Sequence, residues 1–347
     1  GRINLLSGDA QHASGSVLLQ TGSATTGSSG AIELQTGNAA ENAGGIAIGG
    51  GSSVSSAGAS LSLNAGGSDT STGGSILISS GRGAAAAGAI QVSSADSDTN
   101  SGLIGINSGS AQSGSSGSVA ITTGRSLSRS GAISVTAGGV SDGSFGADIT
   151  VAAGNSATST GGSLIMSSGA SELGASGGIT LETSSTVSGS GRLLFQSGIS
   201  ANGPSGSIAL KAGPSLVSDE SSSTINVFAG SSASGVGANV NIMGGESQLQ
   251  TGGTIMVQSG ASDTQMSGSI DASTAASTAA SGAITIGTGV SKTTSSGPIK
   301  LSTGDASNGV AGDFILKTGD STAGGGNIAM SAGSGDIANG GSVALSS

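Results

Sequence analysis

The sequence predicts an all-β fold, a parallel β-solenoid, and three observations support that prediction. A seven-residue phrase recurs along the whole chain, as in "GSILISSGRGAAAAGAIQVSSA" over residues 74–95. Its apolar residues stand at alternate positions, which is the pattern of one face of a β-strand. The segments between phrases are short and consist largely of Gly, Ser, Ala, Thr, Asn and Asp, which are typical of tight turns.

The phrase occurs 24 times at nearly constant spacing. We number each phrase from its first apolar residue, which is position 0. Position −2 is Gly in 20 of the 24 phrases, position +2 is large and apolar in 23, and position +4 is Ser, Thr, Ala or Gly in all. A period this regular is typical of a repeat array. The residues at position 0 are Ile3, Val17, Ile32, Ile46, Leu61, Ile76, Ile90, Ile104, Val119, Ile133, Ile149, Leu164, Ile179, Leu193, Ile208, Ile225, Val240, Ile255, Ile270, Ile284, Ile299, Phe314, Ile328 and Val343.

Each phrase is expected to form one strand of the solenoid. Positions −2, 0, +2 and +4 share one face of an extended segment, and the phrase is rich in Ile and Val and bounded by Gly. Helix is disfavoured because Gly and β-branched residues dominate. A lone strand cannot bury its apolar face, whereas stacked copies of it can. We expect the small residues at the strand ends to let the solenoid wall bend and close.

Position +1, which would point outward, differs between odd and even phrases. It is large and apolar in six phrases, all of them even-numbered. The sequence therefore predicts two strands per coil of about 29 residues and about 12 coils, in one uninterrupted array over residues 1–347 without caps. Such an array would be a segment of a longer chain or a subunit that stacks end to end. The six side chains predict a lateral contact strip: Leu18, Leu77, Ile165, Leu194, Met256 and Ile315.

The composition excludes several classes of function. The net charge is −10 and the nine Lys and Arg are scattered, which argues against nucleic-acid binding. The absence of Cys excludes disulfides and thiolate metal sites. No apolar run reaches the length of a transmembrane helix, so membrane insertion is not expected.

Few residues could carry chemistry. His12 is the only His, and a His in a loop without a neighbouring nucleophile is typically solvated. The acidic pairs Asp96/Asp98 and Asp219/Glu220 lie in turns, whereas a glycosidase requires two carboxyl groups that flank the scissile bond. We therefore predict no catalytic, cofactor-binding or metal-binding residues, and a protein that is not an enzyme.

Two binding alternatives remain open beside a structural role. Aspartates recur at similar loop positions and favour turn formation over calcium binding, because they do not repeat in every coil: Asp69, Asp263, Asp305, Asp320 and Asp336. An ice-binding face would require Thr outward in register. The outward positions hold only Thr150, Thr180 and Thr285, mixed with Glu, Lys and Leu. A module that binds ice or glycans with one flat face is the alternative function.

Phrases such as "GSVLLQTG", "GAIELQTG" and "GSVAITTG" resemble the Gly/Ser/Thr-rich repeats of large surface and secreted proteins. Such repeats occur in algal, diatom-like extracellular proteins and in microbial adhesin stalks. The resemblance spans the whole chain and implies an extracellular or cell-surface location, with no functional residues carried over. The expected function is a filament, stalk or surface fibre that forms by end-to-end or lateral self-association, with surface glycans as a further partner.

Overall fold

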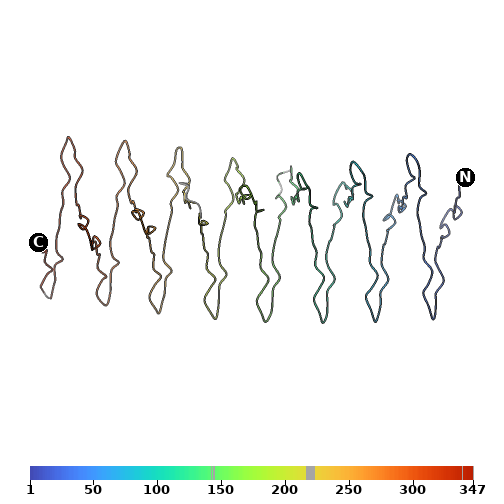
Figure 1. The fold of residues 1–347 in the computed structure, drawn as a ribbon, viewed down its shortest axis with the longest axis horizontal. Coiled ribbons are helices and arrows are strands. Elements are labelled where there is room, and N and C mark those ends of the chain that lie inside the picture. Colours follow the sequence, from blue (N-terminus) through green and yellow to red (C-terminus); the bar gives the residue numbers. More distant parts are fainter. Residues whose placement is uncertain (142, 144, 216–222, 338, 347) are drawn as a thin grey trace. The chain divides into compact units, whose positions relative to one another are not determined.

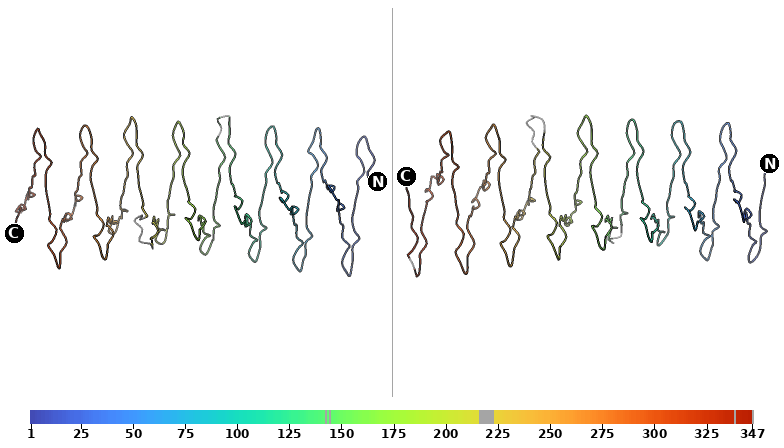
Figure 2. Two further views of the ribbon diagram at one scale, coloured as in Figure 1. Left: turned by 45° about the horizontal axis from the view of Figure 1, so that its top comes forward. Right: turned by 60° about the horizontal axis from the view of Figure 1, so that its bottom comes forward.

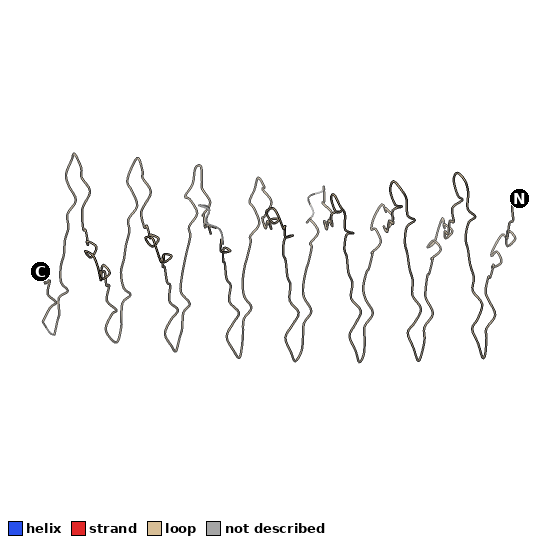
Figure 3. Cartoon of the chain, in the orientation of Figure 1, coloured by secondary structure: helices blue, strands red, loops and turns tan. Residues whose placement is uncertain are grey.

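The structure is a computed structural model that describes residues 1–141, 143, 145–215, 223–337 and 339–346. Across these residues the chain forms neither a helix nor a strand, so there are no element bounds to give (Figure 3). The chain divides into two units, Gly1–Ser167 and Ser168–Ser347. Within each unit, extended stretches alternate with narrow loops (Figures 1 and 2).

The predicted parallel β-solenoid is therefore wrong. Neither the two strands per coil nor the stack of about 12 coils is present in the described residues. The physical reason is the lack of pairing, because a strand exists only where its backbone groups bond to a neighbouring strand. The nine backbone hydrogen bonds of the described chain all close loops between consecutive phrases, and none joins two phrase interiors.

The described residues also lack a hydrophobic core, and no side chain among them is fully buried. The accessible surface is 34442 Å² for a chain of 31.7 kDa. A compact globular protein of this mass would expose only about 12,000 Å². The apolar residues of the phrases therefore stay in contact with solvent in the single chain.

We call the base of each loop the neck, where positions +4 and +5 of one phrase face position −2 of the next. At most necks of the described chain the two sides lie in contact, and Gly297 and Gly312 are exceptions. In nine necks the N–H at position −2 donates a hydrogen bond to the carbonyl oxygen at position +5, at 2.8 to 3.0 Å. The Gly74 N–H, for example, lies 2.8 Å from the Gly66 oxygen. The acceptor is Gly in all nine, so the chain approaches itself closely where no side chain intervenes.

At the tightest necks, a side chain at position −2 would crowd position +4. A Cβ atom added to Gly74 would lie 3.3 Å from the Cβ of Ala65, and one added to Gly326 would lie 3.3 Å from the Cβ of Thr318. Position +4 is correspondingly the most covered place in the repeat. Six of the seven described residues that are not classed as exposed occupy it: Ser7, Ser94, Ser197, Ala212, Ser259 and Thr318.

Where position −2 is not Gly, the residue on the other side of the neck, at position +4, is small. Four phrases carry another residue there: Ala59, Ala147, Ser223 and Ala238. The residues at position +4 of the preceding phrases are Gly50, Ala137, Ala212 and Ala229. None of these is Ser or Thr, although Ser or Thr holds position +4 in 15 of the 23 necks. The two sides of a neck therefore compensate each other in size.

A second regular contact shapes the loop beyond the neck. Where position +7 is Ser or Thr, its side-chain oxygen generally accepts a hydrogen bond from a backbone N–H further along the loop. Where two successive phrases start 14 residues apart, which is the shorter common spacing, the donor is two residues later. Between Ile90 and Ile104, for example, Thr99 N lies 3.3 Å from Ser97 Oγ. Where they start 15 residues apart, which is the longer common spacing, the donor is three residues later. Between Ile255 and Ile270, for example, Gln265 N lies 3.0 Å from Ser262 Oγ. These local turns compete well with regular secondary structure.

Candidate functional site

The most regular chemical feature of the structure is the exposed apolar pair of each phrase. Ile76 at position 0 is 52% exposed and Ile78 at position +2 is 68% exposed, and other phrases have similar values. The pairs are separated along the chain by nearly constant lengths, with a loop between one pair and the next. The arrangement offers many similar apolar patches, and within the described residues it brings together no group of metal-binding side chains.

The six residues of the predicted lateral contact strip are all exposed. Their exposed fractions run from 56% at Leu194 to 88% at Leu77. Their alternation predicted one common face of a sheet, but the described residues contain no sheet that could hold them on such a face. Their role in lateral contact stays a prediction.

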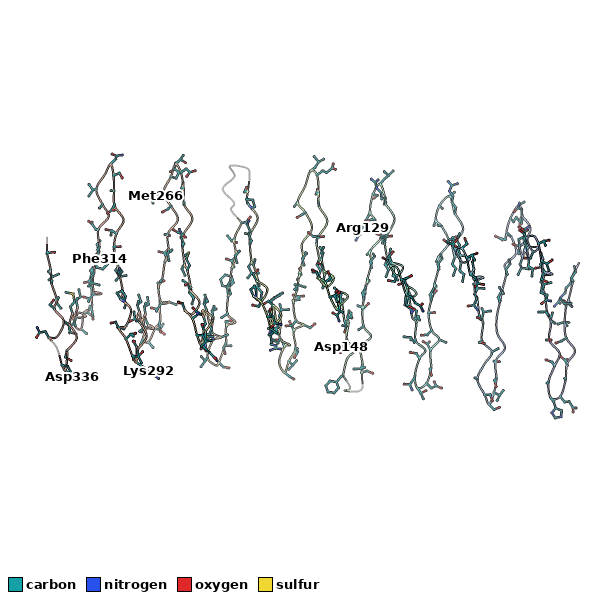
Figure 4. All side chains as sticks on the ribbon, turned by 90° about the horizontal axis from the view of Figure 1, so that it is seen from below. Arg129, Asp148, Met266, Lys292, Phe314 and Asp336 are labelled. Carbon is teal, nitrogen blue, oxygen red and sulfur yellow. The ribbon has the colours of Figure 1, made fainter. Side chains whose placement is uncertain are left out.

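Large apolar side chains in the loops were missed by the sequence analysis. Val54, Leu127, Leu173 and Val187 are as exposed as residues in an open chain, and Met266 lies in another such loop (Figure 4). Among the first eight loops only Val54 is of this kind, whereas most loops from residue 124 onward carry one. The pattern was visible as single large residues within Gly- and Ser-rich segments, which we treated as polar turns.

The candidate catalytic groups do not form a site in the described chain. His12 is exposed in its loop, and Asp96 and Asp98 are exposed in theirs. The pair Asp219/Glu220 lies outside the described residues. No three His, Asp or Glu side chains of the described part lie close enough to hold a metal ion together.

The loop aspartates considered for calcium are each solvated. Asp336 lies at the bend of its loop, as Lys292 does in another (Figure 4). Asp320 forms the single ion pair of the described residues, with Lys317 Nζ 3.4 Å from its Oδ2. Both side chains of that pair are largely exposed, and such pairs add little stability.

Neither an ice-binding face nor a membrane-spanning helix is formed by the described residues. Thr150, Thr180 and Thr285 are exposed, but the described chain forms no flat sheet to align them. No helix long and apolar enough to cross a bilayer is found in the part that the structure describes.

Comparison with known proteins returned no match: no family model fits the sequence, and no curated protein or solved structure is significantly similar to it. The resemblance to surface and secreted repeat proteins thus rests on the phrases alone.

Proposed function

We propose that this chain is a non-enzymatic structural protein that self-associates, through its repeated apolar phrases, into a filament, stalk or surface fibre. The observation that carries the proposal is the recurrence of an exposed apolar pair in 23 of the 24 phrases at nearly constant spacing. The extracellular or cell-surface location is part of the proposal and is supported by the resemblance of the phrases to surface-protein repeats.

A second copy of the chain is the partner that fits this pattern, because it presents the same apolar pairs at the same intervals. The side chain at position 0 is typically about half exposed, as at Ile46 with 50%. Burying the rest of such a side chain is worth about 1 kcal/mol. One contact is weak, but contacts repeated along two chains add up, which favours assembly over isolated pairs.

The experiment is sedimentation and electron microscopy of the purified chain over a range of concentrations. The proposal expects elongated assemblies above a threshold concentration. A chain that stays monomeric at every concentration overturns it.

Two variants with six Ser substitutions each locate the contact. The phrase variant replaces the predicted contact strip: Leu18, Leu77, Ile165, Leu194, Met256 and Ile315. The matched loop variant replaces exposed loop residues: Val54, Leu173, Val187, Leu249, Met266 and Val290. We expect the phrase variant to raise the threshold concentration at least about tenfold, which corresponds to about 1.4 kcal/mol, and the loop variant to change it little. The opposite ranking would assign the contact to the loops.

A further inference from the structure

One loop of this acidic chain carries two positive charges. Residues 124–130, which we call the basic loop, contain Arg125 and Arg129 and no acidic residue. Among the described loops no other holds two Lys or Arg. Neither guanidinium is in an ion pair with a described residue. Arg125, Ser126 and Leu127 line an open hollow of about 390 Å³.

A second loop has the same framework and the opposite charge. Residues 95–101, which we call the acidic loop, contain Asp96 and Asp98 and no Lys or Arg. Both loops follow phrases with the shorter common spacing, from Ile90 to Ile104 and from Val119 to Ile133. In both, the hydroxyl at position +7 accepts a backbone hydrogen bond from two residues later: 3.3 Å at Ser97 and 3.2 Å at Ser126.

The necks of the two loops are alike as well. A Cβ added to Gly102 would lie 3.6 Å from Ser94 Cβ, and one added to Gly131 would lie 3.7 Å from Thr123 Cγ2. The chain therefore presents two loops of similar construction with two negative charges on one and two positive charges on the other.

We propose that the basic loop of one copy binds the acidic loop of a second copy, an inference that rests on the proposed self-association. The charges are complementary, and no ion pair joins the two loops within the described chain. Among the described loops, each copy carries one loop of each kind, two phrases apart, so the contact is heterologous. A heterologous contact that does not close on itself generates an open filament.

The loop pairing sets the offset between copies. Two copies running in the same direction would be staggered by two phrases, which brings even phrases against even phrases. Exposed ion pairs are weak and screened by salt, so the apolar phrases supply most of the attraction and the charges select the register.

Cysteine cross-linking tests the offset, because the native chain contains no Cys. Single variants carry Asn100→Cys in the acidic loop, Ser130→Cys in the basic loop, or Ser115→Cys in the uncharged loop between them. Pairs of variants are mixed at low salt and oxidised. We expect disulfides between Asn100→Cys and Ser130→Cys chains to exceed every other combination at least about fivefold, and to lose that excess in about 0.5 M salt.

Charge reversal provides the second measurement. Arg125→Glu with Arg129→Glu, and separately Asp96→Lys with Asp98→Lys, are introduced into both cysteine chains. Each reversal should abolish the excess, and all four substitutions together should restore it with the polarity exchanged. Arg82→Glu with Arg192→Glu changes the net charge as much as the basic-loop reversal does, and should leave the excess in place.

The outcomes separate this inference from the proposed function. Equal cross-linking in all combinations, or the largest yield with Ser115→Cys, overturns the loop pairing even if the chain assembles. If only the basic-loop reversal matters, and inorganic sulfate protects Arg125 from trypsin, the loop binds an anion and the pairing is wrong. Preferred cross-linking without sedimenting assemblies would support the pairing and overturn the proposed fibre.

Discussion

The phrase interiors and the loops of this protein differ in the hydrogen bonds that they form. The phrases contain most of the large apolar side chains, yet their interiors make no backbone hydrogen bonds in the described chain. The loops consist mainly of small and polar residues, with a single large apolar residue in many of them. Many are closed by backbone bonds or shaped by Ser and Thr hydroxyls. Closing a short loop costs little chain entropy, whereas pairing two phrases requires a partner from further away. Local order therefore arises in the loops while the phrases remain available for contact.

The largest expected effect contrasts two nearby trypsin sites. Lys300 lies inside a phrase, between Ile299 and Leu301, and Lys292 lies in the preceding loop. Both are exposed, so the dilute chain should be cut at similar rates after each. On assembly, cleavage after Lys300 should fall at least about tenfold, because access requires local opening, and cleavage after Lys292 should persist. Mass spectrometry of the fragments measures both rates.

Stronger protection of Lys292 than of Lys300 would contradict this expectation, because the loops would then be the buried part of the assembly.

An intermediate effect is expected at the neck. Gly74→Val places side-chain carbon where a Cβ already meets Ala65 Cβ at 3.3 Å, and should disrupt the 2.8 Å bond from Gly74 N to the Gly66 oxygen. Because such a bond is worth about 0.5–1.5 kcal/mol, we expect amide exchange at residue 74 to rise up to about tenfold. Gly67→Val is the matched control, since nothing lies within 4 Å of a Cβ there.

A size exchange supplies the second control for the neck. Gly50→Ala puts a Cβ 2.8 Å from the Ala59 oxygen, and should weaken the bond from Ala59 N to Gly51. Adding Ala59→Gly removes the Ala59 Cβ, 3.2 Å from the added atom, and leaves the Ala59 oxygen in place, so it should restore that bond in part. If the double variant exchanges as fast as Gly50→Ala alone, the two sides of the neck do not compensate each other.

The smallest effect is expected from the loop hydroxyls. Ser53→Ala removes the acceptor of the 3.0 Å bond from Ser56 N. The turn is exposed, so the loss should be about 0.5–1 kcal/mol, or a two- to fivefold faster exchange of the Ser56 amide by NMR. Ser52→Ala removes a hydroxyl without a hydrogen bond in the described chain and should leave that exchange unchanged. If both variants speed up the exchange equally, the hydrogen bond to Ser53 Oγ does not protect the Ser56 amide.

The necks show which contacts the residue pattern predicts and which it does not. Gly at position −2 and a small residue at +4 were recognised, but they were assigned to the bending of a solenoid wall. The structure places them against each other at the neck, as Gly74 and Ala65 show. Alternation such as Ile76 and Ile78 defines an apolar face, but it carries no information about which segment pairs with it.

The contact role of the six strip residues stays a prediction, because nearly every described residue is exposed. Leu77 and Ile165 were identified from their outward position, and the structure shows them exposed. The shared face expected for them required a sheet, which the described residues do not form. Leu127 and Leu173 were missed because a single apolar residue in a turn has no periodicity to reveal it.

By itself the sequence determined the period of the chain, the alternation of apolar residues within each phrase, the net charge of −10 and the placement of opposite charges in two loops. These are properties of residue order, which no conformation changes. Only the tertiary structure decided that Gly and small residues meet at necks and that the phrases stay unpaired and exposed. Contacts across a loop depend on how the backbone turns, and strand pairing depends on a partner segment, so neither follows from the spacing of residues alone.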